Sequence, residues 1–173
     1  MEFYLMNIGS EPYIIQVGDR VAQLVVVKEE REKEEWAFEQ VEKPDTEPFP
    51  LTINENTLVL NDNIQLRSFE KIKIPTGFKV KIPDDSVLFV NISIDLSNQG
   101  VYLSNGTGVI DSDYYDADNE GHIYLVIENL NAHSLEIKSG ETLATTTVKT
   151  FSAPPDDEPK QQKRTGGRGS TGK

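Results

Sequence analysis

The sequence predicts an all-β protein, and three observations support this class. Short segments rich in Val, Ile and Thr recur along the 173 residues, and such side chains suit a pleated, half-buried sheet surface. Gly, Pro, Asn and Asp separate these segments at close spacing, which is typical of turns between strands. Only residues 28–37 lean towards a helix, and their Glu/Lys/Arg run is equally consistent with a charged strand exit. Many short strands at this spacing favour a sandwich or a barrel.

Nine segments are expected to form strands, and two Pro-rich stretches separate them into regions. The expected strands are Phe3–Ile8, Tyr13–Val17, Val21–Val27, Lys71–Ile74, Phe78–Ile82, Val87–Ile94, His122–Ile127, Ser134–Ile137 and Thr142–Val148. The pattern predicts an N-terminal unit over 1–43, a linker over 44–50, a β domain over 51–152 and an arm over 153–173. The arm has no core-forming residues, so it is expected to be disordered when free.

Composition excludes several classes of function. The chain has no Cys, which excludes disulfides and thiolate metal sites. No apolar run approaches 18 residues and no signal-peptide pattern is present, so we expect a soluble, cytoplasmic protein without a membrane partner. The net charge of −12 disfavours binding to nucleic acid. The charge is uneven, because residues 160–173 contain five basic residues and no acid.

The segment from Thr107 to Gly121 contains the most informative pattern. Asp111 follows a short apolar run, and an acid at the end of a strand is held rigidly enough to orient a water molecule. Tyr114 comes three residues later and could lie flat against a bound ligand. This combination predicts general-base hydrolysis. The alternative is a long, solvated acidic turn.

An internal repeat is also present. Residues 4–24 match residues 124–146 after a two-residue insertion in the second copy. The copies differ where polar chemistry would lie, since Arg20 and Gln23 become Thr142 and Thr145. The first copy therefore resembles the closing part of one domain, and a second domain follows it.

Three segments resemble motifs of the trimeric dUTP diphosphatases (dUTPases). Asn105-Gly-Thr-Gly-Val-Ile-Asp111-Ser-Asp-Tyr114, with Asn119–Ile123, is similar to the third motif, and its long loop is similar to enzymes of Gram-positive bacteria and their phages. Gly18–Leu24 is similar to the fourth motif and Arg164–Gly172 to the fifth. The resemblance covers residues 1–42 and 57–173. It implies a dUTPase-like jelly-roll β-barrel with a disordered C-terminal arm, assembled as a homotrimer or as a mixed trimer with a complementing dUTPase chain.

The resemblance also implies a role for each matching residue. Asp111 would orient the water that attacks the α-phosphorus of dUTP or another deoxynucleotide, Tyr114 would pack on the deoxyribose, and Asn105 would lie near the uracil. Mg²⁺ would accompany the triphosphate, although no protein ligand for it can be identified. Three further groups are implied: Gln23 and Ser93 at the phosphates; Asp19, Arg20 and Gly108 as structural residues; and Arg164, Arg168, Gly169, Ser170 and Thr171 as the part of the arm that closes over the nucleotide.

The chain departs from the family pattern at the first two motifs. Residues 45–63 contain no metal-linked aspartate motif, and Ile92-Ser93-Ile94 keeps one serine of the phosphate loop without its arginine. In the arm, Arg168 occupies the position of a base-stacking Phe, and an arginine plane can also stack. Two functions therefore stay open: a dUTP diphosphatase, alone or as a subunit of a composite enzyme, and a catalytically inert dUTPase-fold binding or regulatory protein. A dCTP deaminase relative is disfavoured by the arm and by the Asp111–Tyr114 pattern.

Overall fold

The computed structural model describes residues 36–152 and residues 11, 12, 14–17, 19 and 21. This part is almost entirely β, as predicted. Its elements are β1 (Ala37–Gln40), β2 (Leu51–Asn54), β3 (Thr57–Leu60), β4 (Ile64–Leu66), β5 (Lys71–Pro75), β6 (Phe78–Lys81), β7 (Ser86–Ile92), α1 (Ile94–Asn98), β8 (Val101–Leu103), β9 (Gly108–Asp111), the 3₁₀ turn η1 (Ser112–Tyr114), β10 (Tyr124–Asn129), β11 (Leu135–Ile137) and β12 (Thr142–Thr150).

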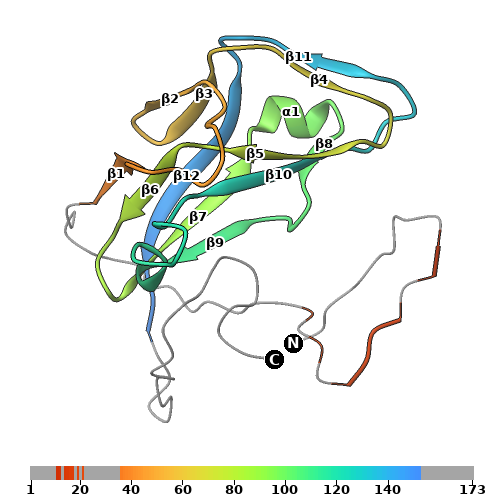
Figure 1. Ribbon diagram of the computed structural model, residues 1–173. Helices are drawn as coiled ribbons and strands as arrows, with labels where there is room; N and C mark the ends of the chain where they lie inside the picture. Colours follow the sequence, from red (N-terminus) through yellow and green to blue (C-terminus); the bar gives the residue numbers. More distant parts are fainter. Residues whose placement is uncertain (1–10, 13, 18, 20, 22–35, 153–173) are drawn as a thin grey trace.

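Two larger sheets form the body, and two strand pairs extend it (Figure 1). The five-stranded sheet has the order β2-β3-β12-β7-β9, and the three-stranded sheet has the order β5-β10-β8. β1 pairs with β6, and β4 pairs with β11. Every pairing is antiparallel. In the described residues the sheets do not close into one continuous hydrogen-bonded barrel.

The core lies between the two larger sheets. Successive side chains of a strand point to opposite faces, and β10 follows this rule, with Leu125, Ile127 and Asn129 buried and the residues between them half-buried. Leu88 and Val90 of β7 are buried in the facing sheet. One continuous cluster of buried apolar side chains joins both sheets, so residues from β2 to β12 share a single core.

Most of the expected strands after residue 70 are confirmed, and several elements were missed. Strands β1 to β4 and β8 were not predicted, because three or four residues carry little periodic signal. β9 was expected only as the strand that Asp111 ends, and this is confirmed. The expected strand Val87–Ile94 ends at Ile92, where Ser93 begins α1. Residues 14–17 of the expected strand Tyr13–Val17 are described and form no strand. Apart from residue 21, the other expected strands before residue 28, and residues 28–35 of the expected helix, fall outside the described part.

The segment predicted as a linker, 44–50, packs against the β domain. The amide of Phe49 donates to the carbonyl of Pro75 at 2.8 Å, and Pro48 lies against Gly77, where an added Cβ would approach it to 2.8 Å. The preceding strand β1 pairs with β6. Residues 37–50 therefore belong to the same folded body as residues 51–152. In the described residues no helix is long and apolar enough to cross a membrane.

Candidate functional site

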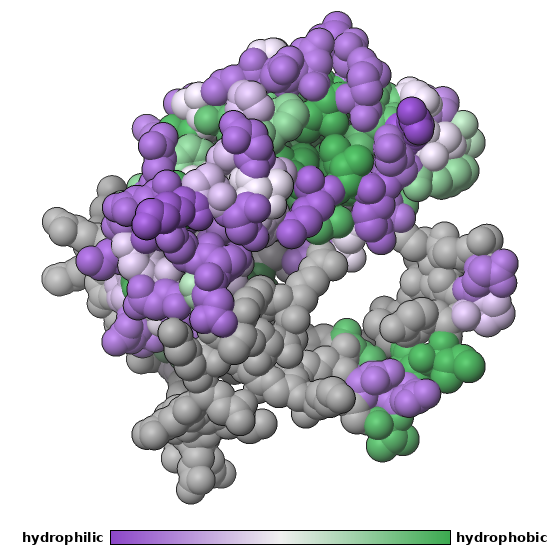
Figure 2. All heavy atoms as spheres, viewed as in Figure 1, coloured by the Kyte–Doolittle hydropathy of each residue, from purple (hydrophilic) through white to green (hydrophobic). Residues whose placement is uncertain are grey.

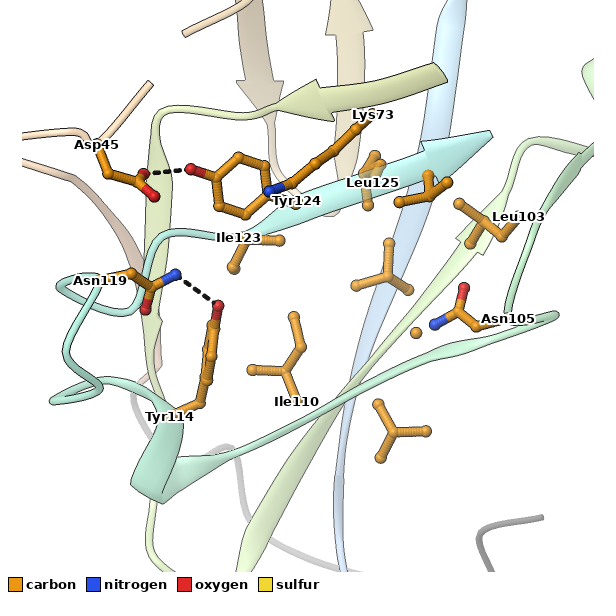
Figure 3. A pocket seen from close by; sticks show the side chains of 14 residues that line it. Asp45, Lys73, Leu103, Asn105, Ile110, Tyr114, Asn119, Ile123, Tyr124 and Leu125 are labelled. Atoms are coloured by element: carbon orange, nitrogen blue, oxygen red, sulfur yellow. Dashed lines mark hydrogen bonds between the residues drawn. The ribbon is translucent and has the colours of Figure 1, made fainter. Parts of the chain in front are cut away.

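A pocket opens where two consecutive strands join different sheets. β8 pairs with β10 and β9 pairs with β7, and each is the last strand of its sheet. The two strands diverge from the turn that connects them and leave a pocket of about 480 Å³ (Figure 3). The pocket is lined by Asp45, Lys73, Val90, Leu103, Asn105, Gly108, Val109, Ile110, Tyr114, Asn119, Ile123, Tyr124, Leu125 and Val126.

Open strand edges border this pocket. Among the described strands, β9 pairs on one side only, with β7. β10 pairs with β5 over Tyr124–Glu128, but with β8 only over Ile127–Asn129. The amide of Ser104 donates to the carbonyl of Val126 at 2.8 Å. Before Val126, the edge of β10 faces the pocket. A strand edge presents a row of backbone donors and acceptors. The pocket can therefore hold a flat polar heterocycle between apolar walls.

The turn between β8 and β9 places Asn105 at one end of the pocket. Gly106 has φ +73°, a left-handed conformation that glycine adopts without strain. The hydroxyl of Thr107 donates to the side-chain oxygen of Asn91 at 2.8 Å, which ties the turn to β7. Gly108 then passes so close to Val90 that an added Cβ would meet its side chain at 3.2 Å. Gly108 was predicted as a structural residue, and this close approach gives it a physical role.

Tyr114 forms the opposite wall and is fixed at its hydroxyl. It lies in η1, directly after β9, and its side chain is buried. The hydroxyl donates to the carbonyl of His122 at 2.8 Å and accepts from the Asn119 amide at 2.9 Å. Figure 3 shows its ring rising along the pocket towards Ile123. The sequence predicted that the Tyr114 ring could lie against a ligand, and in the structure Tyr114 lines the pocket.

The loop after Tyr114 folds against the body on one side, where Ala117 is buried, while the acids Asp113, Asp116 and Asp118 are exposed to solvent. Gly121 has φ +70°, and an added Cβ would lie 2.6 Å from the carbonyl oxygen of Tyr115, so only glycine fits there. The hydroxyl of Tyr115 donates to Glu39 on β1, and the Lys79 ammonium lies 4.3 Å above its ring centroid. The Glu39 carboxylate and burial raise the pKa of Tyr115.

A polar cluster closes the pocket beside Tyr114. His122 is fully buried; its Nε2 accepts the amide of Gly77 at 2.9 Å, and its Nδ1 lies 2.9 Å from the Asp45 carboxylate. Because Nε2 accepts, Nδ1 carries the proton and donates it to Asp45. Tyr124 also donates to Asp45, and the Lys73 ammonium lies 3.5 Å above the Tyr124 ring centroid (Figure 3).

These contacts shift two pKa values in opposite directions. The hydrogen bond from Tyr124, followed by the one from His122, lowers the pKa of Asp45 below its ordinary value of 3.8. Burial, followed by the hydrogen bond to Asp45, raises the pKa of Tyr124 above 10.0. Asp45 is therefore an anion and Tyr124 a neutral donor at physiological pH, so their hydrogen bond is charge-assisted.

The remaining predicted residues that the structure describes do not line the pocket. Asp111 ends β9 directly before η1, next to Ile110 of the pocket wall, and is half-buried. Ser93 is buried at the start of α1, where its hydroxyl accepts the amide of Leu96 at 3.3 Å. The carboxylate of Asp19 accepts the amide of Gln16 at 2.8 Å within a local turn. Arg20, Gln23, Arg164, Arg168, Gly169, Ser170 and Thr171 lie outside the described residues.

Four polar side chains of the pocket were not among the predicted site residues: Asp45, Lys73, Asn119 and Tyr124. Asp45 lies in the predicted linker, 77 residues before the histidine that it contacts, and no local pattern reveals such a pairing. For Asn119, the signal was its place in the third-motif segment, without an assigned role.

No protein-side metal site is found in the described residues, since no group of three or more His, Asp or Glu side chains could hold an ion. Mg²⁺ commonly binds through one or two carboxylates together with substrate phosphates. An ion carried by a triphosphate is compatible with the pocket, whereas a protein cage for it is not present in this part of the chain.

Comparison with known proteins gives consistent matches. No family model matches the chain. The chain is 37% identical over 102 residues to the deoxyuridine 5′-triphosphate nucleotidohydrolase of Lactococcus lactis, a match that covers 57% of this chain and 68% of that enzyme. It is 31% identical over 85 residues to the enzyme of the same name from Fusobacterium nucleatum, covering 49% of this chain and 55% of that enzyme.

Solved structures agree on the fold. The dUTPase of Streptococcus mutans matches with a TM-score of 0.54 and 24% identity, over 68% of this chain and 97% of that one. A mutant dUTPase from phage phi11 of Staphylococcus aureus, which coordinates a structural Mg(II) ion, matches with a TM-score of 0.51 and 15% identity, over 74% and 98%. The expected jelly-roll arrangement of strands is thereby confirmed.

Proposed function

Since this chain belongs to the dUTPase family, we propose that it binds deoxyuridine nucleotides in the pocket between β8 and β9 and takes part in the hydrolysis of dUTP to dUMP and diphosphate. The observation that carries the proposal is the pocket itself. Open edges of β9 and β10 face apolar walls, with Asn105 at one end and Tyr114 on the opposite wall. Such a pocket suits a small planar base with polar edges attached to a sugar.

Asp111 is the proposed general base. It directly follows Ile110, whose side chain lines the pocket, and it precedes the wall residue Tyr114 by three positions. Asp111 itself is not among the lining residues of the pocket, and the proposal is that its carboxylate accepts a proton from a water that attacks phosphorus. Attack at phosphorus also needs its developing charge to be neutralised. Among the pocket-lining residues Lys73 is the one cation, so the triphosphate requires further positive or N–H groups.

We propose that those groups come from two places. The first is the basic arm of residues 160–173, by analogy with the fifth motif. The second is a complementing dUTPase chain in a mixed trimer, because α1 offers little to a phosphate. The Ser93 hydroxyl already accepts the amide of Leu96, Ile94 is 72% exposed, and Asp95 adds an acid to the first turn. Mg²⁺ would arrive bound to the nucleotide and supply charge neutralisation.

Diphosphate release from dUTP tests this proposal. The purified chain should turn over weakly or not at all, because each missing electrostatic donor typically costs on the order of 10²–10³ in rate. Adding a dUTPase that carries intact first and second motifs but is inactivated at its own general base should restore hydrolysis. A rate of roughly 1–10 per second by the chain alone, ordinary for enzymes, would show a self-sufficient enzyme.

The same α1 features favour a second candidate, an inert dUTPase-fold binding protein. Binding without hydrolysis, in the presence and absence of the complementing chain, would establish it. Isothermal titration with a non-hydrolysable dUTP analogue makes this distinction. Lack of binding by both the chain and the mixture would contradict both candidates.

A further inference from the structure

The Tyr114 hydroxyl is held in a closed triangle of hydrogen bonds. It donates to the carbonyl of His122 at 2.8 Å. The side-chain amide of Asn119 donates to that hydroxyl at 2.9 Å and to the same carbonyl at 3.0 Å. Tilting of the Tyr114 ring axis would move the hydroxyl away from both groups and break these bonds. The triangle therefore fixes the position of the ring along the pocket wall.

The carbonyl of His122 is itself fixed by the rest of its residue. The buried ring accepts from Gly77 and donates to Asp45, and the amide of His122 donates to the carbonyl of Asn119 at 3.1 Å. Neighbouring Ile123 is bound to β6 and to Thr76. The His122 carbonyl is thus held in place, and the Asn119 side chain connects it to the Tyr114 hydroxyl.

Asn119 contains a buried polar atom that destabilises the fold. Its Oδ1 is buried and, within the described part of the chain, has no hydrogen-bond partner. A buried acceptor without a partner is destabilising, and such groups in native proteins call for a reason. The adjacent Glu120 adds backbone strain, since its φ is +57°. Costs of this kind concentrate at functional sites.

We propose that Asn119 is a positioning residue, which holds the Tyr114 ring in place against the pocket and thereby sets the preference of the pocket for deoxyribose over ribose. This inference rests on the proposed function, because it takes Tyr114 as the wall beside the sugar. A movable apolar wall discriminates only weakly against an added hydroxyl. A wall that is held in place discriminates more strongly. A tyrosine locked at its hydroxyl cannot yield, whereas one held by a single bond can tilt and admit the 2′-hydroxyl.

The test compares the affinities of the full chain for non-hydrolysable dUTP and UTP analogues, measured by isothermal titration. Asn119→Ala should lower the ratio of the two affinities about tenfold, the effect of roughly one to two hydrogen bonds, mainly by tighter binding of the ribose analogue. The melting temperature should change little, because the substitution also removes the unpaired oxygen.

Asn61→Ala is the matched control. The Asn61 amide also donates to a hydroxyl at 2.9 Å, that of Thr52, and Asn61 does not line the pocket. Its affinity ratio should equal that of the unmodified chain. In a Tyr114→Phe background, Asn119→Ala should have no further effect, since the hydroxyl through which it acts is gone.

The outcomes separate the two proposals. If the unmodified chain prefers the deoxy analogue and Asn119→Ala keeps the full preference, the role of Asn119 is wrong and the proposed function stands. A further loss of discrimination in the Tyr114→Phe background would likewise overturn it, because Asn119 would then act by another route. If neither the unmodified chain nor its mixture with the complementing chain binds either analogue, the proposed function and this inference fail together. Equal affinities for the two analogues would overturn this inference alone, because the wall at Tyr114 would then not discriminate between the sugars.

Discussion

The pocket between β8 and β9 and the start of α1 are neighbours in the chain, but they are equipped in opposite ways. In the pocket, polar groups face a space that a ligand could fill, and the wall residue Tyr114 is fixed by two hydrogen bonds. At the start of α1 the Ser93 hydroxyl is used within the helix, and Ile94 and Asp95 are exposed. Figure 2 shows hydrophobic atoms gathered over α1 and β8, with hydrophilic atoms around them.

The difference indicates that, under the proposed function, binding of the nucleoside and binding of its phosphates are separable in this fold. The described domain holds a pocket of about 480 Å³, which the proposal assigns to the base and the sugar. It lacks the donors and cations that three phosphates need, because charged oxygens are stabilised by charge-assisted hydrogen bonds and α1 presents an apolar and an acidic side chain instead. An assembly that contains this domain must bring the phosphate-binding groups from elsewhere.

The largest effect is expected for Asp111→Asn, which removes the proposed general base. The amide cannot take a proton from water, so hydrolysis by the active assembly should fall roughly 10²–10⁴-fold, while the affinity for a non-hydrolysable dUTP analogue stays within about twofold of the original, a difference well below one hydrogen bond. Asp113→Asn, in the same 3₁₀ turn, is the control and should keep most of the rate. Retention of turnover by Asp111→Asn would remove Asp111 from the mechanism.

Removal of residues 160–173 tests the phosphate side. Each charge-assisted bond to phosphate contributes roughly 1.5–3 kcal/mol, so the truncated chain should bind the dUTP analogue at least about tenfold more weakly. Its melting temperature should be unchanged. Added salt should weaken binding by the intact chain more than binding by the truncated one. Equal affinities would show that the arm serves a partner or solubility, and would leave the phosphate side to another chain.

Two glycine substitutions compare the loops at the two ends of the pocket. Gly106→Ala and Gly121→Ala both place a side chain at positive φ, which costs about 1 kcal/mol, but only Gly121 is enclosed, with the carbonyl oxygen of Tyr115 at 2.6 Å from an added Cβ. Gly121→Ala should therefore lower the free energy of unfolding by about 3 kcal/mol. Urea denaturation measures both, and equal losses would show that the loop around Gly121 yields easily.

The smallest expected effect concerns pH. The folded-state pKa of Asp45 lies below its ordinary value of 3.8, so its contribution to stability is fully present above pH 3.8 and is lost as the pH falls through the lower folded value. The stability difference between the chain and its Asp45→Asn variant should thus be constant near neutral pH and shrink below pH 3.8. The effect is small because 51% of the Asp45 side chain is exposed. A difference that does not change with pH would contradict the ionic role.

The class of fold and one wall of the pocket could be predicted from the sequence, because both depend on local patterns. Strands such as β10 and β12 are rich in apolar and β-branched residues, and Asn105, Asp111 and Tyr114 lie within one segment of ten residues. The other wall could not be predicted. Asp45 meets His122 and Tyr124 only through the packing of residues 44–50 on β5 and β6, and α1 begins inside a run whose composition suits a strand.

The seam between β8 and β9 also has a mechanical consequence. The two strands are edge strands of different sheets. In the described residues, no ladder of backbone hydrogen bonds therefore joins the two sheets there. A bound base that hydrogen-bonds to both edges would supply that connection between the layers. Without ligand, amides of β9 and of residues 124–125 should exchange their hydrogens sooner than those in the seven-residue pairing of β7 with β12. With ligand, this seam should become one of the slower-opening parts of the domain.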